Sequence, residues 1–530
     1  MRPYLKKLHV NWLLLLIVLF ALSLRLYGIA SSVTDWHAFR QADTASVTKE
    51  YVKRGIDLLH PRFHDYGNVA SGKDNPEGYR MVEFPIINAL IATVLRALPV
   101  LDLVVISRLT SVIFSLGTVI CLYYLGKRWA NPTVGYLSAL SFAVLPYAVF
   151  YSRVILPEPF FVFFLTLSIV SFDLWLEEKR WGWYLTTLIS FTITLLLKPF
   201  GLFFAPVLAY LAIRHFKQRV FFQPALYLFG LSLIPLWWWR SWIAKFPEGI
   251  PASDWLFNSL DGNPIRLRPA WFRWLVWERY AKMILGGGGL LAALLSIFGK
   301  NKLRELLIVW GGCVLAYLVI IAAGNVRHDY YQTITLPLVS LAMGQGLWVV
   351  SQITQPRKLL ALWIAAVALI TVITYFPEPG SIEQYRPSIF MIFTWGVLGG
   401  WTAFAALKQI HSRILGLKYA VVLGASAIII GNWFVHGYYH TRPDYELAGA
   451  AVDRLTPPDA KVIAPAFGDT ILLFQTNRTG WALGFEIEDK IEKGATYYVS
   501  TAYDDEARAL EQQYTVIEKT DNHIIIKLTP

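Results

Sequence analysis

The sequence predicts an all-α polytopic membrane protein with a small α/β domain in its C-terminal region. Of its 530 residues, 55% are hydrophobic and 16% are charged, whereas average soluble domains carry roughly 25% charged residues. Apolar runs of about 20 residues, the length that crosses a bilayer, recur along most of the chain. After residue 440 the sequence is more polar, and helix-like segments alternate with strand-like segments.

The positive net charge does not indicate a nucleic-acid partner. The formal net charge is +12. The basic residues cluster in short loops between apolar runs, where such residues set the orientation of membrane proteins. The two cysteines, Cys121 and Cys313, lie inside apolar runs and give neither a disulfide framework nor metal-ligand spacing. We expect no cofactor, although a divalent metal ion stays open.

The apolar runs define the predicted topology. They lie near residues 10–30, 84–99, 104–125, 133–150, 158–176, 182–197, 200–214, 220–242, 284–299, 304–323, 330–351, 358–376, 388–408 and 418–438. If all of them crossed the membrane, three basic clusters would lie on the outer side, against the positive-inside rule. The run at 84–99 is short, contains Arg96 and ends at Pro99, so we predict an amphipathic helix in the outer interface instead. About 13 transmembrane helices then remain, and the basic clusters all face the cytoplasm.

This topology assigns the loops to sides of the membrane. The first apolar run is predicted to be an uncleaved helix, with the basic N-terminus in the cytoplasm of a cytoplasmic (inner) membrane protein. Residues 1–440 form the predicted transmembrane domain, and residues 441–530 form a soluble α/β domain outside the cytoplasm. The predicted outer loops comprise residues 31–103, 151–158, 243–283, 324–329 and 377–387.

Polar side chains gather at the outer ends of the predicted helices, beginning in the first outer loop. On a helix, Arg40, Asp43, Val47 and Glu50 would share one face, and Val47 and Tyr51 could lie against lipid while Arg40 and Asp43 face a cavity. The alternative is an exposed ion pair between Arg40 and Asp43 that does little. Glu83 stands where the chain re-enters the interface, and it alone is weak evidence for a site.

The later outer turns carry further candidates. Arg153 and Glu158 sit in a short turn between two predicted helices, where Glu158 could simply complement a helix dipole. Lys198 lies between two apolar runs, either reaching toward the interface or binding an anionic headgroup. The stretch "GNVRHDYYQ", residues 324–332, holds Arg327, His328, Tyr330 and Tyr331. An interfacial aromatic belt explains its tyrosines but not Arg327 together with His328.

Taken together, five stretches resemble the polytopic glycosyltransferases of the GT-C class. Within this class, the chain resembles the bacterial relatives of the dolichyl-phosphate-mannose protein mannosyltransferases and of the lipid A aminoarabinose transferase. The stretches are "FRQADTA" (39–45), "VEFPIINALIA" (82–92), "SRVILPEPFF" (152–161), "LLLKPFG" (195–201) and "RHDYYQ" (327–332). The resemblance covers roughly residues 10–350 and is specific to the class rather than to a substrate.

The resemblance implies a GT-C fold and a chemistry. A sugar carried on a polyprenyl phosphate passes to a lipid, glycan or protein acceptor at the outer membrane face, usually with inversion. By position Asp43 is the implied general base, although "RQAD" replaces the Asp-Glu pair of many relatives, so Glu83 or Glu158 could share this role. The implied substrate-binding residues are Arg40, Arg153, Lys198, Arg327, His328, Tyr330 and Tyr331, and membrane lipids are further expected partners.

The chemistry of the residue types agrees with this implication. Inverting transfer needs a carboxylate to accept the acceptor's proton, and the departing phosphate needs cations. Two other functions stay open. A transporter or flippase of a lipid-linked sugar would place charged residues near the middle of its spans, whereas here they lie at the outer ends. A non-catalytic scaffold would leave the clustered acids and bases unexplained.

Overall fold

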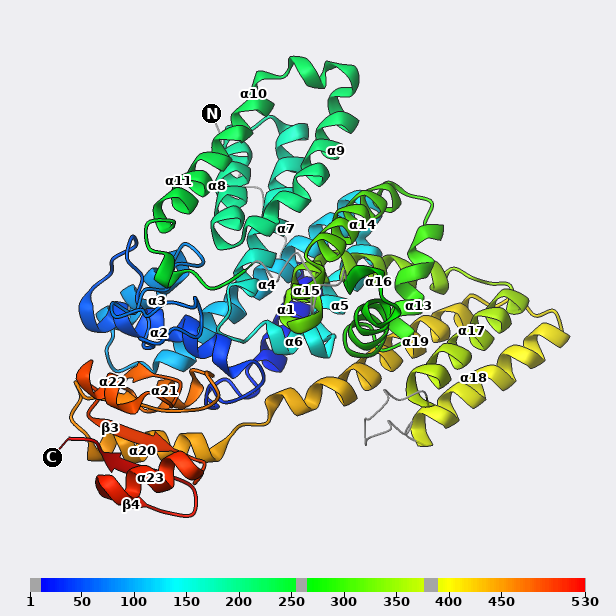
Figure 1. The fold of residues 1–530 in the computed structure, drawn as a ribbon. Helices are drawn as coiled ribbons and strands as arrows, with labels where there is room; N and C mark the ends of the chain where they lie inside the picture. Colours follow the sequence, from blue (N-terminus) through cyan, green and yellow to red (C-terminus); the bar gives the residue numbers. More distant parts are fainter. Residues whose placement is uncertain (1–10, 254–264, 376–388, 530) are drawn as a thin grey trace.

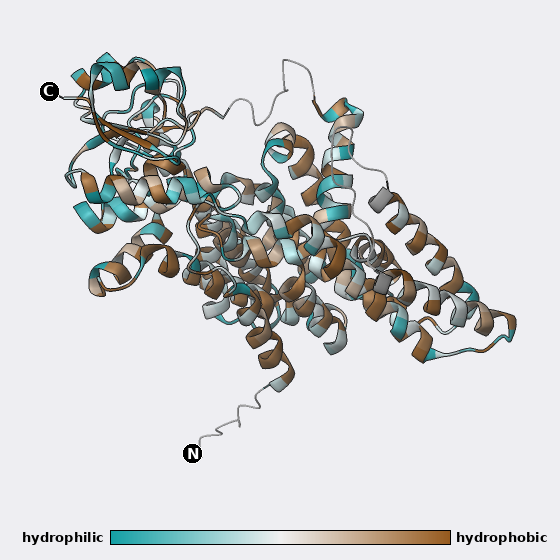
Figure 2. Ribbon diagram, turned by 90° about the horizontal axis from the view of Figure 1, so that it is seen from below, coloured by the Kyte–Doolittle hydropathy of each residue, from teal (hydrophilic) through white to brown (hydrophobic). Residues whose placement is uncertain are grey.

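The computed structural model describes residues 11–253, 265–375 and 389–529. The basic N-terminus, the predicted outer loop at 377–387 and part of the loop at 243–283 lie outside these residues. In the described residues, a helical membrane part is followed by a small sheet-containing C-terminal domain, which lies beside α2 (Ala38–Arg54) (Figure 1). In Figure 2 the hydrophobic colour dominates the helices of the membrane part.

The helices of the membrane part lie mostly in the predicted apolar runs, whereas α2 and the helices within residues 247–284 lie in predicted outer loops. They are α1 (Trp12–Arg25), α2, α3 (Ile86–Ala97), α4 (Leu103–Trp129), α5 (Pro132–Val144), α6 (Pro146–Tyr151), α7 (Glu158–Glu178), α8 (Trp181–Leu197), η1 (Pro199–Phe204), α9 (Ala205–Phe216), η2 (Lys217–Phe222), α10 (Pro224–Tyr227), η3 (Leu228–Ser232), α11 (Leu233–Ile243), η4 (Pro247–Gly249), η6 (Ile265–Leu267), α12 (Pro269–Phe272), η7 (Arg273–Ile284), α13 (Gly288–Leu295), η8 (Ser296–Phe298), α14 (Lys302–Ile320), α15 (Ala322–Arg327), η9 (Asp329–Thr335), α16 (Leu336–Ser351), α17 (Pro356–Tyr375), α18 (Ile389–Leu407), α19 (Arg413–Val435) and η10 (His436–Tyr439).

The protein is a multi-pass membrane protein, but the predicted count of 13 spans is not confirmed. Among the described residues, six helical stretches are long and apolar enough to cross a membrane, or seven if one bent pair forms a single span. Several predicted spans are instead short or interrupted. For example, Pro146 separates α5 from α6, as expected of a residue that lacks an N–H donor and disfavours a helical conformation before it.

Helix α3 has the length expected of a helix that lies in the interface. It contains 12 residues, about 18 Å of helix, whereas a bilayer core is roughly 30 Å thick. One face of α3 packs on α2, where Ala92 joins Val47, Tyr51 and Phe63 in a small cluster. Val47 and Tyr51 are therefore buried within the protein, and the expectation that they lie against lipid is wrong.

The bent pair is formed by η7 and α13, which meet at an angle of 105°. Gly286 and Gly287 have φ of 49° and 65°, in the left-handed region that glycine adopts without strain. A Cβ on Gly286 or Gly288 would lie within 2.4 Å of a backbone oxygen of α19. The "GGGG" stretch therefore permits both the bend and the close approach of α19.

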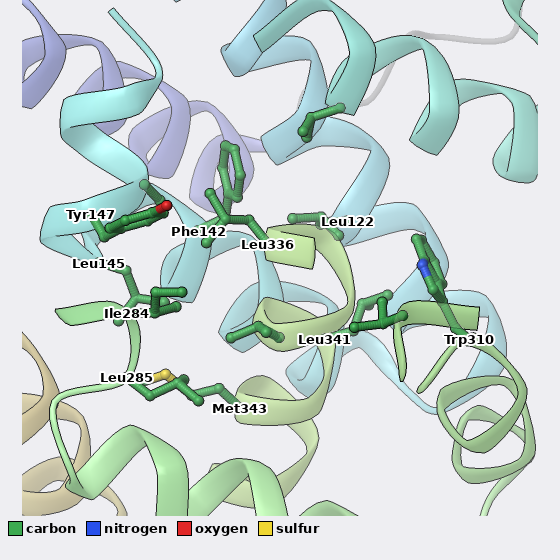
Figure 3. Packing of buried hydrophobic residues seen from close by; sticks show 14 of the residues in the cluster. Leu122, Phe142, Leu145, Tyr147, Ile284, Leu285, Trp310, Leu336, Leu341 and Met343 are labelled. Atoms are coloured by element: carbon green, nitrogen blue, oxygen red, sulfur yellow. The ribbon is translucent and has the colours of Figure 1, made fainter. Parts of the chain in front are cut away.

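One continuous apolar cluster holds the membrane helices together. Figure 3 shows part of it, including Leu122 of α4, Phe142 of α5, Trp310 of α14 and Leu341 of α16. Because lipid tails are as apolar as these side chains, close packing rather than exclusion from water provides most of the association.

The C-terminal domain has the predicted α/β character. Its elements are α20 (Pro443–Leu455), β1 (Lys461–Ile463), α21 (Ile471–Gln475), β2 (Thr479–Trp481), α22 (Ile487–Glu492), β3 (Tyr497–Ser500), α23 (Asp505–Gln513), β4 (Thr515–Lys519) and β5 (Ile524–Lys527). The strand order is β2-β1-β3-β5-β4. The β2-β1-β3 pairings are parallel, and the pairings of β5 with β3 and β4 are antiparallel.

Alternating side chains cover both faces of this sheet. Val462 of β1 packs in a cluster with residues of α20 and α21, while the adjacent Ile463 packs with residues of α22 and α23. This period of two places one helix pair on each face. Residues 464–470 therefore leave the carboxyl end of β1 and lead directly into α21.

The first outer loop is joined to the edge of the sheet at β2. The Tyr66 N–H donates to the Gly480 carbonyl at 2.7 Å, and the Gly480 N–H donates to the His64 carbonyl at 2.9 Å. Asp65 thereby forms a parallel bridge with Gly480. These backbone bonds fix the C-terminal domain against the loop that precedes Glu83.

Candidate active site

A cavity of about 650 Å³ lies where the first outer loop, the outer ends of the helices and the C-terminal domain meet. Its lining residues are Phe39, Arg40 and Asp43 from α2; Phe63, Asp65, Val69, Ala70, Arg80, Met81, Val82 and Glu83 from the first outer loop; Leu197, Lys198, Pro199 and Phe200 after α8; Leu236 and Arg240 from α11; Ile250, Pro251, Ala252 and Ser253; His328, Tyr330 and Tyr331; and Gly468 and Thr470. Seven of the ten predicted site residues lie in this lining.

Asp43 is held from two sides by residues distant in sequence. The Thr470 hydroxyl donates to Asp43 Oδ1 at 2.7 Å, and Arg80 Nη2 lies 2.8 Å from Oδ2. The Asp43 side chain is 8% exposed. Because an ionised carboxylate offers about four lone-pair sites, these two contacts leave acceptor capacity for a third donor. Asp43 can therefore accept a proton from a group bound in the cavity.

The loop that carries Thr470 is itself fixed by the first outer loop. His64 Nε2 donates to the Thr470 carbonyl at 3.0 Å, and burial lowers the pKa of His64 to about 4, so this ring is neutral. Asp65 Oδ1 accepts the N–H of Gly67 at 3.0 Å and of Ala482 at 3.3 Å. Burial raises the pKa of Asp65 to about 6 despite these bonds.

Arg40 does not form the exposed ion pair with Asp43 that the sequence left open as an alternative. Arg40 instead forms an ion pair with Glu83, while Asp43 pairs with Arg80. Burial alone would raise the pKa of Glu83, but Arg40 and then Lys198 hold it below its usual value. The two carboxylates are thus each matched with an arginine across the first outer loop, and neither pair is an exposed helix-surface pair.

Lys198 is placed by Glu158 and two tyrosines. Lys198 Nζ lies 2.5 Å from Glu158 Oε1 and 4.6 Å from the centre of the Tyr331 ring. The Glu158 side chain is 0% exposed, and Glu158 begins α7 as the dipole alternative expects. Glu158 therefore contacts the site through Lys198, whereas Lys198 borders the cavity together with Tyr330 and Tyr331.

Arg240 adds a further cation from α11. It lines the cavity one turn after Leu236, and within the described ranges no ion pair joins it to a carboxylate. Together with Arg40 and Lys198 it makes this wall suitable for an anion that carries several oxygens, such as a phosphate.

Arg153 and Arg327 do not line the cavity. Arg153 is fully buried, with its Nη2 2.8 Å from Asp35 Oδ2, and Arg108 Nη2 lies 3.2 Å from the same oxygen. Arg153 therefore completes a structural ion cluster, which occupies its guanidinium. Arg327 is exposed at the end of α15. Their assignment to substrate binding thus has no geometric support.

Sequence reasoning missed five charged or hydroxyl-bearing residues of the cavity, which are Asp65, Arg80, Arg240, Ser253 and Thr470. Arg240 carried a signal, because a charged residue inside an apolar run is a functional candidate by default. Arg80 stood three residues before Glu83 but was not singled out. Asp65 and Thr470 gave no signal, because each is an ordinary polar residue in a polar segment.

No candidate metal centre is found among residues 11–253, 265–375 and 389–529. In these ranges no three His, Cys, Asp or Glu side chains are grouped closely enough to hold a metal ion. The arrangement instead combines a carboxylate that can accept a proton with cations that can hold a phosphate.

Comparisons with known proteins support this description. Residues 85–239 match the sequence model of the family described as dolichyl-phosphate-mannose-protein mannosyltransferase. The structure is similar to that of ArnT from Cupriavidus metallidurans in the apo state, with a TM-score of 0.63, 13% sequence identity and 98% of each chain covered. The chain has the GT-C fold. The GT-C resemblance inferred from the five stretches is thereby confirmed.

Two further comparisons show how far this GT-C likeness extends. ArnT from Cupriavidus metallidurans bound to undecaprenyl phosphate gives a TM-score of 0.62 at 13% identity, again with 98% of each chain covered. The arabinosyltransferase EmbB from Mycobacterium smegmatis gives 0.51 at 13% identity, covering 81% of this chain and 40% of EmbB. No curated protein matches the sequence significantly.

Proposed function

We propose that this protein is a membrane glycosyltransferase that moves a sugar from a polyprenyl-phosphate donor to an acceptor hydroxyl. The observation that carries the proposal is the cavity in which the Asp43 carboxylate and the cations Arg40, Lys198 and Arg240 share one lining. The GT-C fold and the match to a mannosyltransferase family support it. The undecaprenyl phosphate named for ArnT supports a lipid-linked donor.

The donor phosphate binds at the cationic wall. A sugar-linked polyprenyl phosphate is a diester with one negative charge, and loss of the sugar leaves a monoester that gains a second charge. Cations fixed at that position stabilise the charge as it develops, so the leaving phosphate needs no protonating acid. Lys198 and Arg240 supply this charge, and Arg40 lies beside them with Glu83 as its counter-ion.

The transfer step is a single displacement at the anomeric carbon. The acceptor oxygen forms a bond to that carbon while the bond from the carbon to the phosphate oxygen breaks. The hydroxyl proton passes to Asp43, and the bonding electron pair leaves with the phosphate. Attack opposite the leaving group inverts the anomeric configuration. A general base of this kind contributes roughly 10²–10⁴-fold to the rate.

Glu83 and Glu158 act as positioning residues in this mechanism. Glu83 pairs with and fixes Arg40, and the buried Glu158 fixes Lys198. Thr470 and Arg80 orient Asp43 from the two sides that the acceptor does not use.

We propose that the site lies on the outer face of the cytoplasmic membrane. The support is the distribution of basic loops, which puts the ends of the helices that carry the cavity outside the cytoplasm. The N-terminus is then cytoplasmic, and the domain after residue 440 is extracytoplasmic. The acceptor is a lipid, a glycan or a protein, and the donor assay below identifies the sugar.

The decisive experiment measures donor consumption. Native membranes that contain wild type or Asp43→Asn receive a panel of polyprenyl-phosphate sugars, and the loss of each is followed by mass spectrometry. Consumption of one donor by wild type alone supports the transferase and identifies the sugar. A parallel assay with a labelled lipid-linked sugar in vesicles tests for flipping. Flipping by wild type without donor consumption would contradict the proposal and favour a transporter.

A further inference from the structure

A second cavity, of about 420 Å³, opens between the C-terminal half of α2, α3 and the start of α4. Lys49 and Lys53 of α2 line it together with Arg96 of α3. With 3.6 residues per turn, positions 49 and 52 lie about 120° and about 180° around α2 from position 43. The remaining lining is apolar and comes from α2, α3 and the connection to α4, and includes Val52, Leu95 and Leu101. We call this cavity the basic pocket.

The basic pocket is lined by three basic side chains that form no ion pair with a carboxylate among the described residues. Within the described residues, no carboxylate lies at ion-pair distance from Lys49, Lys53 or Arg96, and Arg96 donates instead to the Tyr51 carbonyl at 3.3 Å. The adjacent Glu50 is already paired with Arg54 at 2.7 Å. Burial, followed by repulsion from Lys53, lowers the pKa of Lys49 to about 7, although Glu50 and Asp453 act in the opposite direction. The Lys49 Nζ also lies 5.1 Å from the centre of the Phe474 ring. A bound anion would relieve this repulsion.

The surroundings of the basic pocket indicate where that anion comes from. Leu98 is 54% exposed and Val100 is 91% exposed, and both lie in the connection from α3 to α4 next to the lining residues. Helix α4 is apolar and long enough to span a membrane. Apolar side chains this exposed at the start of a span face acyl chains, so the neighbouring cations lie at headgroup depth.

We propose that the basic pocket binds the phosphate of an anionic lipid in the outer leaflet. The phosphate occupies the space between Lys49, Lys53 and Arg96, and the acyl chains lie along Leu98 and Val100. The bound lipid ties the C-terminal half of α2 to the membrane, while the N-terminal half carries Arg40 and Asp43. This site is independent of the reaction proposed above.

The test compares lipid retention by the purified full-length protein in native mass spectrometry. Wild type, the triple variant K49Q/K53Q/R96Q and the control variant K73Q/K245Q/R268Q are each titrated with phosphatidylglycerol and with phosphatidylcholine. The control removes the same charge from exposed positions outside both cavities. Each Lys or Arg near an anionic surface contributes about 1 kcal/mol, so the triple variant should retain phosphatidylglycerol at least about tenfold more weakly.

Three outcomes would overturn the proposal. Equal retention by wild type and the triple variant would show that the anion binds elsewhere. Equal retention of the two lipids by wild type would show that the negative charge is irrelevant. Protection of wild type against heating by inorganic phosphate alone, as strongly as by phosphatidylglycerol, would show that the ligand is a free phosphate.

A second variant covers the possibility that the triple variant folds poorly. Lys53 is exposed near the end of α2, so Lys53→Gln removes one cation with little effect on packing. We expect it to weaken phosphatidylglycerol retention about fivefold relative to wild type, with an unchanged melting temperature. Unchanged retention in this variant would also contradict the proposal.

Discussion

Asp35 and Asp43 lie eight residues apart in the first outer loop, and each contacts an arginine, yet their surroundings differ. Both oxygens of Asp35 are used within the protein, by Arg153, Arg108 and the Gln41 amide, and its side chain is 0% exposed. Asp43 is held by Arg80 and Thr470 but also lines the large cavity. A contact with arginine therefore does not identify a chemical role, because only a carboxylate that also borders a cavity can meet a substrate.

The largest expected effect separates the two aspartates by activity. Asp43→Asn should lower donor turnover by roughly 10²–10⁴-fold, because the amide cannot accept the proton of the acceptor. The melting temperature should change little, since the amide oxygen still accepts from Thr470 and Arg80 borders the cavity. The assay is donor loss per mole of folded protein. Turnover near that of wild type would remove Asp43 as the base.

The second prediction compares the effects of the two aspartates on the stability of the fold. Asp35→Asn should lower the free energy of unfolding by about 3–5 kcal/mol, because two buried arginines lose their counter-ion. Activity per folded molecule should stay within about tenfold of wild type. Thermal unfolding in detergent, with activity measured on the folded fraction, gives both values. If Asp35→Asn instead abolishes turnover without loss of stability, the distinction between a structural and a chemical carboxylate fails.

A third aspartate, Asp65, extends this comparison, because it should make the stability of the fold depend on pH. Its pKa is about 6 in the folded protein, above the ordinary value of 3.8, because of burial. Between about pH 4 and 6 the folded state then holds a proton that the unfolded state has released. The free energy of unfolding should therefore fall by about 2–3 kcal/mol as pH rises through this window, and level off above it.

Asp65→Asn serves as the matched control for this pH effect. Asparagine keeps an oxygen that can accept the Gly67 and Ala482 N–H groups, but it cannot ionise. In this variant the free energy of unfolding should not show the part of the decrease between pH 4 and 6 that Asp65 causes. The variant should be more stable than wild type above pH 6. Melting temperatures from pH 4 to pH 8 provide the measurement, and parallel curves for the two proteins would contradict the assignment.

A smaller effect on activity is expected from the pair of Lys198 and Glu158, in which the lysine borders the cavity and the glutamate does not. The double variant Lys198→Met/Glu158→Gln removes the charge without leaving a buried carboxylate unpaired. Loss of one charged contact to the donor phosphate should raise the KM for donor by about 10–100-fold. Glu158→Gln alone is the control and should raise KM less. An unchanged KM in the double variant would place the phosphate elsewhere in the cavity.

The smallest expected effect concerns Thr470 as a positioning residue. Thr470→Val keeps the shape but removes the hydrogen bond to Asp43, which should lower kcat about fivefold and leave the KM for donor unchanged. Thr470→Ser keeps the hydroxyl and should retain most of the activity. A rise in KM without a change in kcat would indicate that Thr470 contacts the donor instead.

Much of the membrane part was predictable from the sequence, because a bilayer forces each span to be a run of apolar residues. The interruptions, such as the bend at Gly286–Gly287, depend on contacts with α19 and were not. Asp43, Glu83, Arg40 and Lys198 were found because charge at the outer end of an apolar run is unusual. Their partners were not predictable, since Arg80 and Thr470 are selected by tertiary contact and not by local pattern.

The hydrogen bond from Thr470 to Asp43 also sets an order of events during synthesis. The two residues are 427 positions apart. At roughly 5–20 residues per second, Thr470 leaves the ribosome about 20–90 s after Asp43. If the C-terminal domain is extracytoplasmic, it must also be exported and folded before its loop can reach α2. A newly inserted chain therefore has an incomplete cavity until that domain docks, and the growing protein passes through an inactive stage.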